Sequence, residues 1–223
     1  MKRTGKEILL RLVILMVGLI IAHFGVTLFL LSNLGADPFN VLVQGVCRTL
    51  EKATPWGLSH GSVHRILCFV IILVLLFVDR SYVKLGTLVC MFVGGPIIDL
   101  FTLMLGGVLN GSSALWLRVV MLAAGCVILA FGMTVVIKSD AGTGPNDLVA
   151  LVISDKTKAK FSIVRVATDV VFVAAGILQG GVFGVGTVIC AFLVGPVAGI
   201  FLPRNEKRIN AVLKRILKKD SET

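Results

Sequence analysis

The sequence has little charge, few aromatic rings and no clustered metal-binding residues. Charged residues make up 15% of its 223 positions, against ~25% in soluble domains, and it contains one tyrosine and two tryptophans. The five cysteines show no CxxC or other metal-ligand spacing, and no basic patch is interleaved with aromatic residues. These shortages argue against a soluble enzyme, a disulfide-rich secreted module and a nucleic-acid-binding protein. We expect no catalytic residues, no metal and no cofactor, and therefore not an enzyme.

Apolar residues, by contrast, are abundant. They make up 57% of the chain, and the mean hydropathy is +0.99. A membrane helix needs ~20 mostly apolar residues, and six apolar runs approach or exceed that length: 8–31, 62–78, 85–108, 114–137, 163–183 and 184–202. The sequence therefore predicts an all-α membrane protein with about six transmembrane helices, in a single membrane domain over residues 1–203.

The basic residues are unevenly spread along the chain, whose formal net charge is +10. Most of the 22 lysines and arginines fall at the termini or in connections that six spans would place on one face. In membrane proteins the cytoplasmic loops carry the excess of basic residues. This pattern predicts a multi-pass protein with both its N-terminus and its C-terminus in the cytoplasm.

Residues 204–223 form a basic tail with apolar positions at spacings of three and four, namely Ile209, Val212, Leu213, Ile216 and Leu217. Such spacing is typical of an amphipathic helix. Because basic residues lie between the apolar positions, we expect this tail to lie on the anionic inner leaflet of the lipid bilayer. A helix that binds a partner protein is the second interpretation.

Two apolar segments, 39–47 and 148–153, are too short to cross a bilayer comfortably and follow stretches that contain glycine and proline. The first stretch contains Gly35 and Pro38, and the second contains Gly142, Gly144 and Pro145. Proline suits the first turn of a new helix, and non-helical backbone survives at membrane depth only where protein or water satisfies it. We predict short broken or re-entrant helices after both stretches. Extramembrane loops followed by surface helices are the alternative.

The two halves of the sequence resemble each other. The matching stretches are 24–27 with 131–134, 62–65 with 162–165, and 86–92 with 186–192. The offset is 107 residues at first and 100 later, and shared glycine, proline, serine and arginine carry the match. We therefore predict two homologous repeats over about 12–105 and 119–203. Three spans in each repeat would make the second one inverted, as in many secondary transporters, whereas four would make the repeats parallel.

Charged residues inside the predicted spans are candidate site residues. Asp99 lies near the middle of its span, where a carboxylate costs ~2.5–3.5 kcal/mol. We expect Asp99 to bind a cation or a proton or to pair with an arginine on a neighbouring span. An exposed position at a misplaced span end is the remaining alternative. Arg165 and Asp169 are four residues apart and can pair on one helical face. Arg65 matches Arg165 in the repeat, but Phe69 stands where the acid would be.

Residues 34–45 resemble the signature LG-x-x-PWDVL-x-QG of the YczE branch of the YczE/YyaS/YitT membrane proteins. Residues 142–148 resemble the G-x-GPRDGL element of the same branch, and Arg165, 184–187 and 195–196 are similar to its later features. The resemblance covers nearly the whole chain. It implies an integral protein of the bacterial cytoplasmic (inner) membrane, but it does not identify a substrate.

The chain departs from that signature at three positions. Phe39 and Asn40 stand where tryptophan and aspartate are usual, and Asn146 stands where arginine is usual. Asn40 matches Asp147 in the second repeat, so the first repeat lacks the carboxylate that Asp147 provides. This difference argues against a mechanism that needs two symmetric acids.

The leading hypothesis is a transporter or permease-like protein for an unidentified small solute, with its site between the two broken segments. The candidate substrate-binding residues are Gly35, Asp37, Pro38, Asn40, Gly142, Gly144, Pro145, Asn146, Asp147, Asp99, Arg65 and Arg165. One alternative is a membrane substrate-binding subunit that works with a separate energising subunit. Another is a non-transporting regulator or scaffold. Each is compatible with a homo-oligomer, and no nucleic acid partner is expected.

Overall fold

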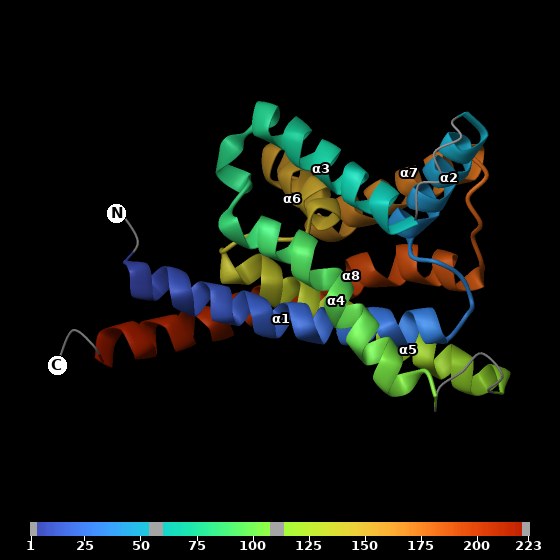
Figure 1. Ribbon diagram of the computed structural model, residues 1–223. Helices are drawn as coiled ribbons and strands as arrows, with labels where there is room; N and C mark the ends of the chain where they lie inside the picture. Colours follow the sequence, from blue (N-terminus) through green and yellow to red (C-terminus); the bar gives the residue numbers. More distant parts are fainter. Residues whose placement is uncertain (1–3, 54–59, 108–113, 220–223) are drawn as a thin grey trace.

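The computed structural model describes residues 4–53, 60–107 and 114–219, and every regular element in these ranges is helical (Figure 1). The elements are α1 (Gly5–Leu31), α2 (Pro38–Ala53), α3 (His60–Val78), η1 (Arg80–Tyr82), α4 (Leu85–Leu105), α5 (Leu115–Ser139), α6 (Pro145–Thr157), α7 (Phe161–Leu178) and α8 (Val185–Lys219). The predicted all-α class is confirmed.

Five of the described helices are long and apolar enough to cross a membrane: α1, α4, α5, α7 and α8. The apolar part of α3, Ser62–Val78, is shorter. At 1.5 Å per residue it is ~25 Å long, less than the ~30 Å hydrocarbon core of a bilayer. The described residues thus support a multi-pass membrane protein with five candidate spans, where the sequence predicts about six, and α3 accounts for the difference.

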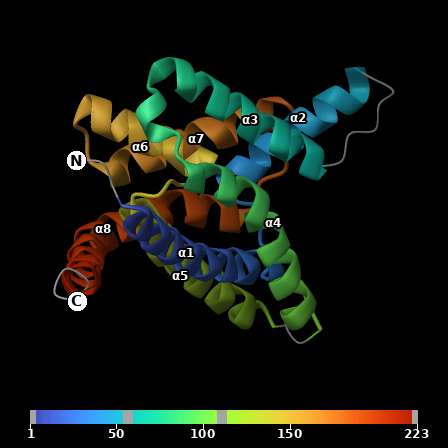
Figure 2. The ribbon, with the colours of Figure 1, turned by 60° about the vertical axis from the view of Figure 1, so that its left-hand side comes forward.

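The helices are arranged in two groups (Figures 1 and 2). Helices α1, α4, α5 and α8 lie together, and α2, α3, α6 and α7 lie above them in Figure 1. In the first group α5 packs on α1 and α8, and α4 packs on α1. In the second group α2 packs on α7, and α3 packs on α6. Helix α7 also packs on α8 and so joins the two groups.

The central helices of the first group, α1 and α5, run antiparallel at very short range. A Cβ added at Gly25 would lie 2.4 Å from the backbone nitrogen of Leu129, and one at Gly132 would lie 2.3 Å from that of Ala22. Small residues allow this close backbone approach between membrane helices. The two glycines therefore set the distance between α1 and α5.

Each loop before a short helix is bonded to the start of a long helix from the other half of the chain. The carbonyl of Leu34, before α2, accepts a 2.9 Å hydrogen bond from the N–H of Gly186 in α8. The carbonyl of Ala141, before α6, accepts a 2.9 Å hydrogen bond from the N–H of Gly86 in α4. The same bond thus occurs at matching positions, and it satisfies backbone groups inside the protein.

Two arginines bind the ends of α1 and α5 in a matching way. Arg118 of α5 donates through Nε to the carbonyl of Ser32, just after α1, at 2.7 Å. Arg11 of α1 donates through Nη1 to the carbonyl of Ser139, the last residue of α5, at 3.0 Å. The last carbonyls of a helix have no partner within it. Each arginine therefore stabilises the end of the other helix.

The described part of the predicted tail, residues 204–219, is helical and continues α8 without interruption, whereas 220–223 lie outside the described residues. On it Ile209 and Leu213 are buried, while Val212 and Ile216 are exposed. Part of its apolar face therefore packs against the protein, and the remaining part faces outward. Placement of the tail on the inner leaflet stays a prediction.

Replacing Gly25 by alanine is expected to lower the melting temperature of the detergent-solubilised protein, because the new Cβ would push α1 away from α5. Overpacking of this kind costs ~1–3 kcal/mol. Gly95→Ala is the matched control, since a Cβ at this helical glycine of α4 would meet nothing within 4 Å. Thermal unfolding followed by size-exclusion chromatography measures both variants. Equal melting temperatures would contradict the close approach of α1 and α5.

Candidate functional site

Two glycines shape the loops that lead into the short helices. Gly35 has a φ of 149° and Gly142 a φ of 144°, values that residues with a side chain rarely adopt. A Cβ at Gly142 would also lie only 2.3 Å from the backbone nitrogen of Thr87. Helix α2 then begins at Pro38 and α6 at Pro145. Both prolines occupy the first helical position, where the missing N–H costs no hydrogen bond.

The start of α6, after its cap residue Gly144, faces two charged residues of α7. Arg165 Nη1 lies 2.5 Å from Asp147 Oδ1, and Arg165 Nε lies 3.1 Å from Asp169 Oδ2. The side chains of Arg165 and Asp169 are 8% and 1% exposed. The sequence predicts the pair within α7, and the structure adds Asp147 from another helix. These three residues are called the Arg165 cluster below.

The Arg165 cluster leaves one acceptor without a donor. Asp169 Oδ1 is buried and has no hydrogen-bond partner within the described part of the chain. A buried polar atom without a partner costs ~1–3 kcal/mol, and more when it is charged. A ligand that donates a hydrogen bond or carries positive charge would therefore gain free energy at Asp169.

The start of α2 adds a further carboxylate to this region. Asp37 accepts a 3.2 Å hydrogen bond from the backbone N–H of Asn40 and a second bond from the Asn40 side-chain amide. It thereby caps the first turn of α2. Asp37 also lies close enough to Asp169 to interact with it electrostatically. Asp169 thus lies within electrostatic range of two further carboxylates, Asp37 and Asp147, and of the one guanidinium of Arg165, so the region has an excess of negative charge.

Three other predicted site residues make no polar contact with the Arg165 cluster. Arg65 is exposed on α3, and its guanidinium donates to the hydroxyl of Ser62 at 3.2 Å. Asp99 is exposed on α4 and makes no ion pair or hydrogen bond with the residues that the structure describes. Asn146 is half-buried in the first turn of α6. The structure therefore joins the two short helices to α7 and leaves the predicted charges of α3 and α4 apart.

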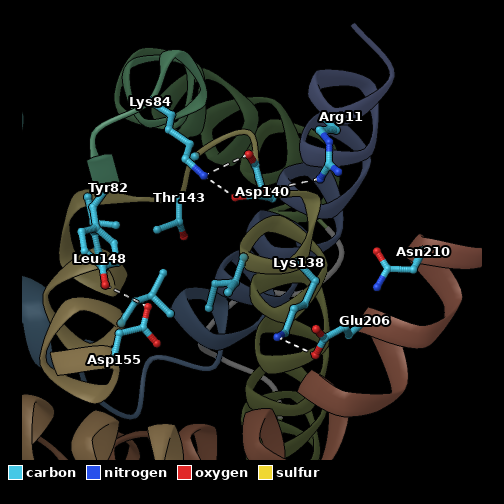
Figure 3. Close-up of a pocket in the computed structure, with 13 residues that line it drawn as sticks. Arg11, Tyr82, Lys84, Lys138, Asp140, Thr143, Leu148, Asp155, Glu206 and Asn210 are labelled. Atoms are coloured by element: carbon cyan, nitrogen blue, oxygen red, sulfur yellow. Dashed lines mark hydrogen bonds and ion pairs between the residues drawn. The ribbon is translucent and has the colours of Figure 1, made fainter. Parts of the chain in front are cut away.

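A pocket of about 330 Å³ opens where α5 ends and the loop to α6 begins (Figure 3). Its polar side chains form contacts across it: Lys84 with Asp140, Lys138 with Glu206 at 2.8 Å, and Tyr82 with Asp155 at 3.1 Å. Thr143 lies between these pairs, and its hydroxyl is buried without a partner among the described residues. A polar cavity with an unpartnered hydroxyl suits water or a small polar ligand.

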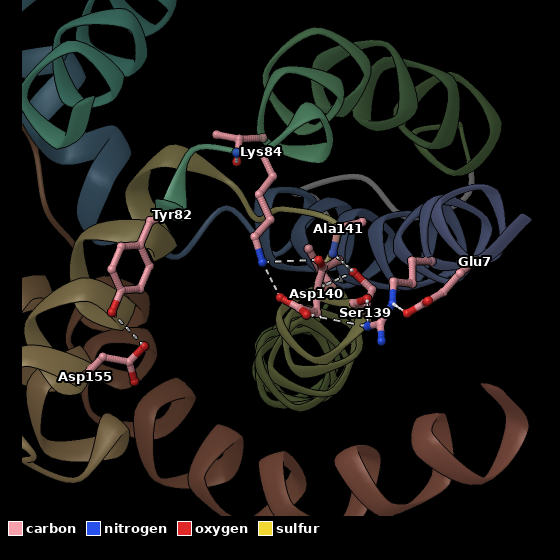
Figure 4. Close-up of polar contacts among 10 residues, drawn as sticks. Glu7, Tyr82, Lys84, Ser139, Asp140, Ala141 and Asp155 are labelled. Atoms are coloured by element: carbon pink, nitrogen blue, oxygen red, sulfur yellow. Dashed lines mark hydrogen bonds and ion pairs between the residues drawn. The ribbon is translucent and has the colours of Figure 1, made fainter. Parts of the chain in front are cut away.

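Asp140 is the centre of an ionic network in the wall of this pocket (Figure 4). Its carboxylate pairs with Lys84 and lies 3.6 Å from Arg11, and Arg11 also pairs with Glu7 at 2.8 Å. The network ties α1, the end of α5 and the segment before α4 together at one end of the molecule. The matching position in the first half is Asn33, which carries no charge.

Tyr82, in η1 outside the candidate spans, supplies a neutral donor to the pocket. Burial raises the pKa of its phenol above the ordinary value, and the carboxylate of Asp155, which accepts its hydrogen bond, adds to the shift. The phenol therefore keeps its proton at neutral pH and continues to donate to Asp155.

The charged residues that line the pocket were not among those predicted from the sequence. One signal was available, because Arg11 and Arg118 stand 107 residues apart, the offset that relates other matching residues. Charges near the ends of spans are, however, typical of cytoplasmic loops in general. The sequence pattern alone could not separate a pocket wall from an ordinary loop.

Comparisons with known proteins agree with the motif resemblance. The family described as "Family of unknown function (DUF6198)" matches residues 9–203. The chain is 26% identical to "Uncharacterized membrane protein YczE" of Bacillus subtilis (strain 168), over 94% of each chain. It is 24% identical to YyaS of the same strain, over 86% of this chain and 92% of YyaS. It is 30% identical to an uncharacterized protein of Haemophilus influenzae, over 85% of this chain and 82% of that one. No solved structure matches.

Arg165→Gln is expected to destabilise the protein strongly, because it would leave Asp147 and Asp169 without their cation. Removing one partner of a buried ion pair costs ~3–5 kcal/mol. Arg65→Gln removes the matching but exposed arginine of α3, and it should leave the melting temperature in detergent nearly unchanged. Adding Asp147→Asn and Asp169→Asn to Arg165→Gln should recover part of the loss. Equal effects of the two arginine substitutions would contradict this account of the cluster.

Proposed function

We propose that this chain, which belongs to the DUF6198 family of YczE-like membrane proteins, is a carrier for a small solute in the bacterial cytoplasmic membrane. The family description names no function, so the proposal depends on the site. The observation that carries it is the Arg165 cluster, a set of charged side chains packed inside a multi-pass membrane protein. Ionisable residues within membrane segments are unfavourable and mark ion or solute pathways.

We take the membrane domain to consist of six spans in two inverted repeats, with α2 and α6 as short helices that enter from opposite sides. Three observations support this arrangement. The matching helices α1 and α5 run antiparallel, the loop hydrogen bonds of Leu34 and Ala141 occur at matching positions, and residues 141–143 are buried. Inverted repeats with broken helices at the midplane are the architecture of many secondary transporters.

The pocket end of the molecule is proposed to face the cytoplasm. Arg11, Lys84 and Lys138 line the pocket, and the basic end of α8 leaves the protein on the same side as the start of α1 (Figure 1). Basic residues concentrate on the cytoplasmic side of membrane proteins, and the exposed ones of α8 would lie near the anionic inner leaflet. The pocket is then the cytoplasmic entrance to the site, since Thr143 in its wall precedes Asp147 by four residues.

The charge of the site favours a solute that carries a positive group, such as a protonated amine. The three carboxylates of Asp37, Asp147 and Asp169 outnumber the single guanidinium of Arg165, and Oδ1 of Asp169 has no hydrogen-bond partner among the described residues. A cation would balance this charge, whereas an anion would add to the repulsion. The positive ends of α2 and α6 do not reverse this preference, because Asp37 and Asp147 already lie in or next to their first turns.

Reconstitution of the purified chain alone in liposomes tests the proposal. The liposomes would be loaded with choline, agmatine, lysine, glutamate and glucose, and the loss of each solute would be measured by mass spectrometry. We expect a positively charged solute to leave faster than from protein-free liposomes. Asp147→Asn should slow this flux by roughly tenfold or more, as expected for the loss of a charge-assisted hydrogen bond.

Asp79→Asn is the control variant for the flux measurement. Asp79 pairs with Lys156 at the surface, at 3.5 Å, and its replacement should leave the flux unchanged. Saturable binding of one of these solutes without flux would favour a substrate-binding subunit that needs an energising partner. The absence of both binding and flux for all five solutes would count against the carrier.

Cysteine labelling in intact cells tests the proposed topology. The five native cysteines are buried, so a membrane-impermeant maleimide should react mainly with introduced ones. We expect Asn33→Cys and Val182→Cys, both at exposed positions, to react in intact cells. Ser81→Cys and Thr157→Cys, also exposed, should react only after the membrane is opened. Labelling of Ser81→Cys from outside would instead indicate eight spans and parallel repeats.

A further inference from the structure

In the second half of the chain, α7 packs closely on α8. A Cβ added at Gly195 of α8 would lie 2.7 Å from the carbonyl oxygen of Ser162 and 3.5 Å from the Cβ of Arg165. A Cβ at Gly199, one turn later, would lie 3.1 Å from the Cβ of Ser162. The first turns of α7, which carry Arg165, therefore pack directly against two glycines of α8.

The matching helices of the first half, α3 and α4, do not pack closely on each other in this way. Helix α3 packs on α2, α6 and η1, and α4 packs on α1 and α6. Met91 of α4 packs against the apolar cluster that α2 and α3 share. A Cβ at Gly95, which matches Gly195, would meet nothing within 4 Å among the described residues. Open space thus remains at Gly95, where its counterpart in α8 is closely packed.

The two helices carry opposite charges at the positions that match the closed contact. Arg65 of α3 matches Arg165; it is exposed and bonds to the hydroxyl of Ser62. Asp99 of α4 matches Gly199; it is exposed and has no polar partner in the described part of the chain. If α3 packed on α4 as α7 packs on α8, Ser62 would lie against Asp99, and Arg65 would lie against Gly95, one turn from Asp99.

The region between α3 and α4 borders the candidate site. Cys68 of α3 and Cys90 of α4 are both buried, and both lie within electrostatic range of Asp147. A movement of α3 relative to α4 would therefore change the surroundings of the Arg165 cluster. In the other half, the corresponding helices α7 and α8 already pack on each other.

We propose that α3 closes on α4 in a second conformation, in which Arg65 and Asp99 form an ion pair. Unpaired charges within a membrane span are unfavourable, and the pair removes both from lipid. The closed contact uses the packing that the matching residues already adopt in the other half. Its role as a gate rests on the carrier proposed above, whereas the closure itself is a property of the chain alone.

Disulfide crosslinking in native membranes tests the closure. Ile66→Cys with Gly95→Cys is the test pair, because Val166, which matches Ile66, lies 3.0 Å through its Cγ2 from a Cβ built at Gly195. Ser162→Cys with Gly199→Cys is the positive control, since that contact is already closed. We expect an oxidant to link both pairs within one chain, the test pair more slowly. Each single-cysteine variant controls for reaction with the native cysteines, which are buried.

The ion pair is tested in the same background. Arg65→Gln or Asp99→Asn should lower the crosslinking rate of the test pair by roughly threefold or more, the shift expected for a lost ion pair. The exchange of charges, Arg65→Asp with Asp99→Arg, should restore most of the rate. None of these substitutions should affect the crosslinking rate of the control pair, because that pair lies in the other half of the chain.

Three results would overturn the closure. The first is that the test pair forms no crosslink while the control pair reacts. The second is that the crosslinking rate does not respond to the charge substitutions. The third is that the crosslink joins two chains. The last result would show that a second copy covers this face. Since crosslinking needs no solute, its failure with intact solute flux would remove the gate and leave the carrier. A crosslink in the test pair without solute flux would support the closure and count against the carrier.

Discussion

In the membrane arrangement proposed above, the backbone polar groups of the two interrupted segments must find partners inside the protein, because hydrocarbon provides none. The hydrogen bonds from Gly186 to Leu34 and from Gly86 to Ala141 meet this requirement. In both cases the partner belongs to the other half of the chain. Neither half can therefore complete its own loop, and the positions of α2 and α6 depend on the assembly of the two halves.

The site follows from this arrangement. Once the loop through Ala141 is held against α4, the first turn of α6 brings Asp147 to within 2.5 Å of Arg165. The buried guanidinium then has carboxylates on both sides, from α6 and from α7. One oxygen of Asp169 has no donor among the described residues, so a positively charged ligand would gain free energy there. The charges of the cluster also hold α6 on α7.

The two halves share a packing plan but differ in chemistry. The second half closes its contact with the glycines of α8 and buries the Arg165–Asp169 ion pair. The first half has Asn40 where the second has Asp147, and Asp99 where the second has Gly199. Its own contact between α3 and α4 stays open. In the proposed carrier, one closed half and one open half would provide the asymmetry that alternating access to a central site requires.

The features that the sequence determined by itself are those that depend on neighbouring residues. The apolar runs, the helix starts at Pro38 and Pro145 and the Arg165–Asp169 pair all follow from local composition and a spacing of at most a few turns. The all-helical class and the family also follow from the sequence. The exact number of spans does not follow from the sequence, because α3 is close to the minimum length for crossing a bilayer. The tertiary structure alone decided the partners of Asp147, the polar pocket beside Asp140 and the exposure of Arg65 and Asp99. These contacts depend on how helices far apart in the chain are packed, and a charge in an apolar run has the same local pattern whether it meets a partner or faces lipid.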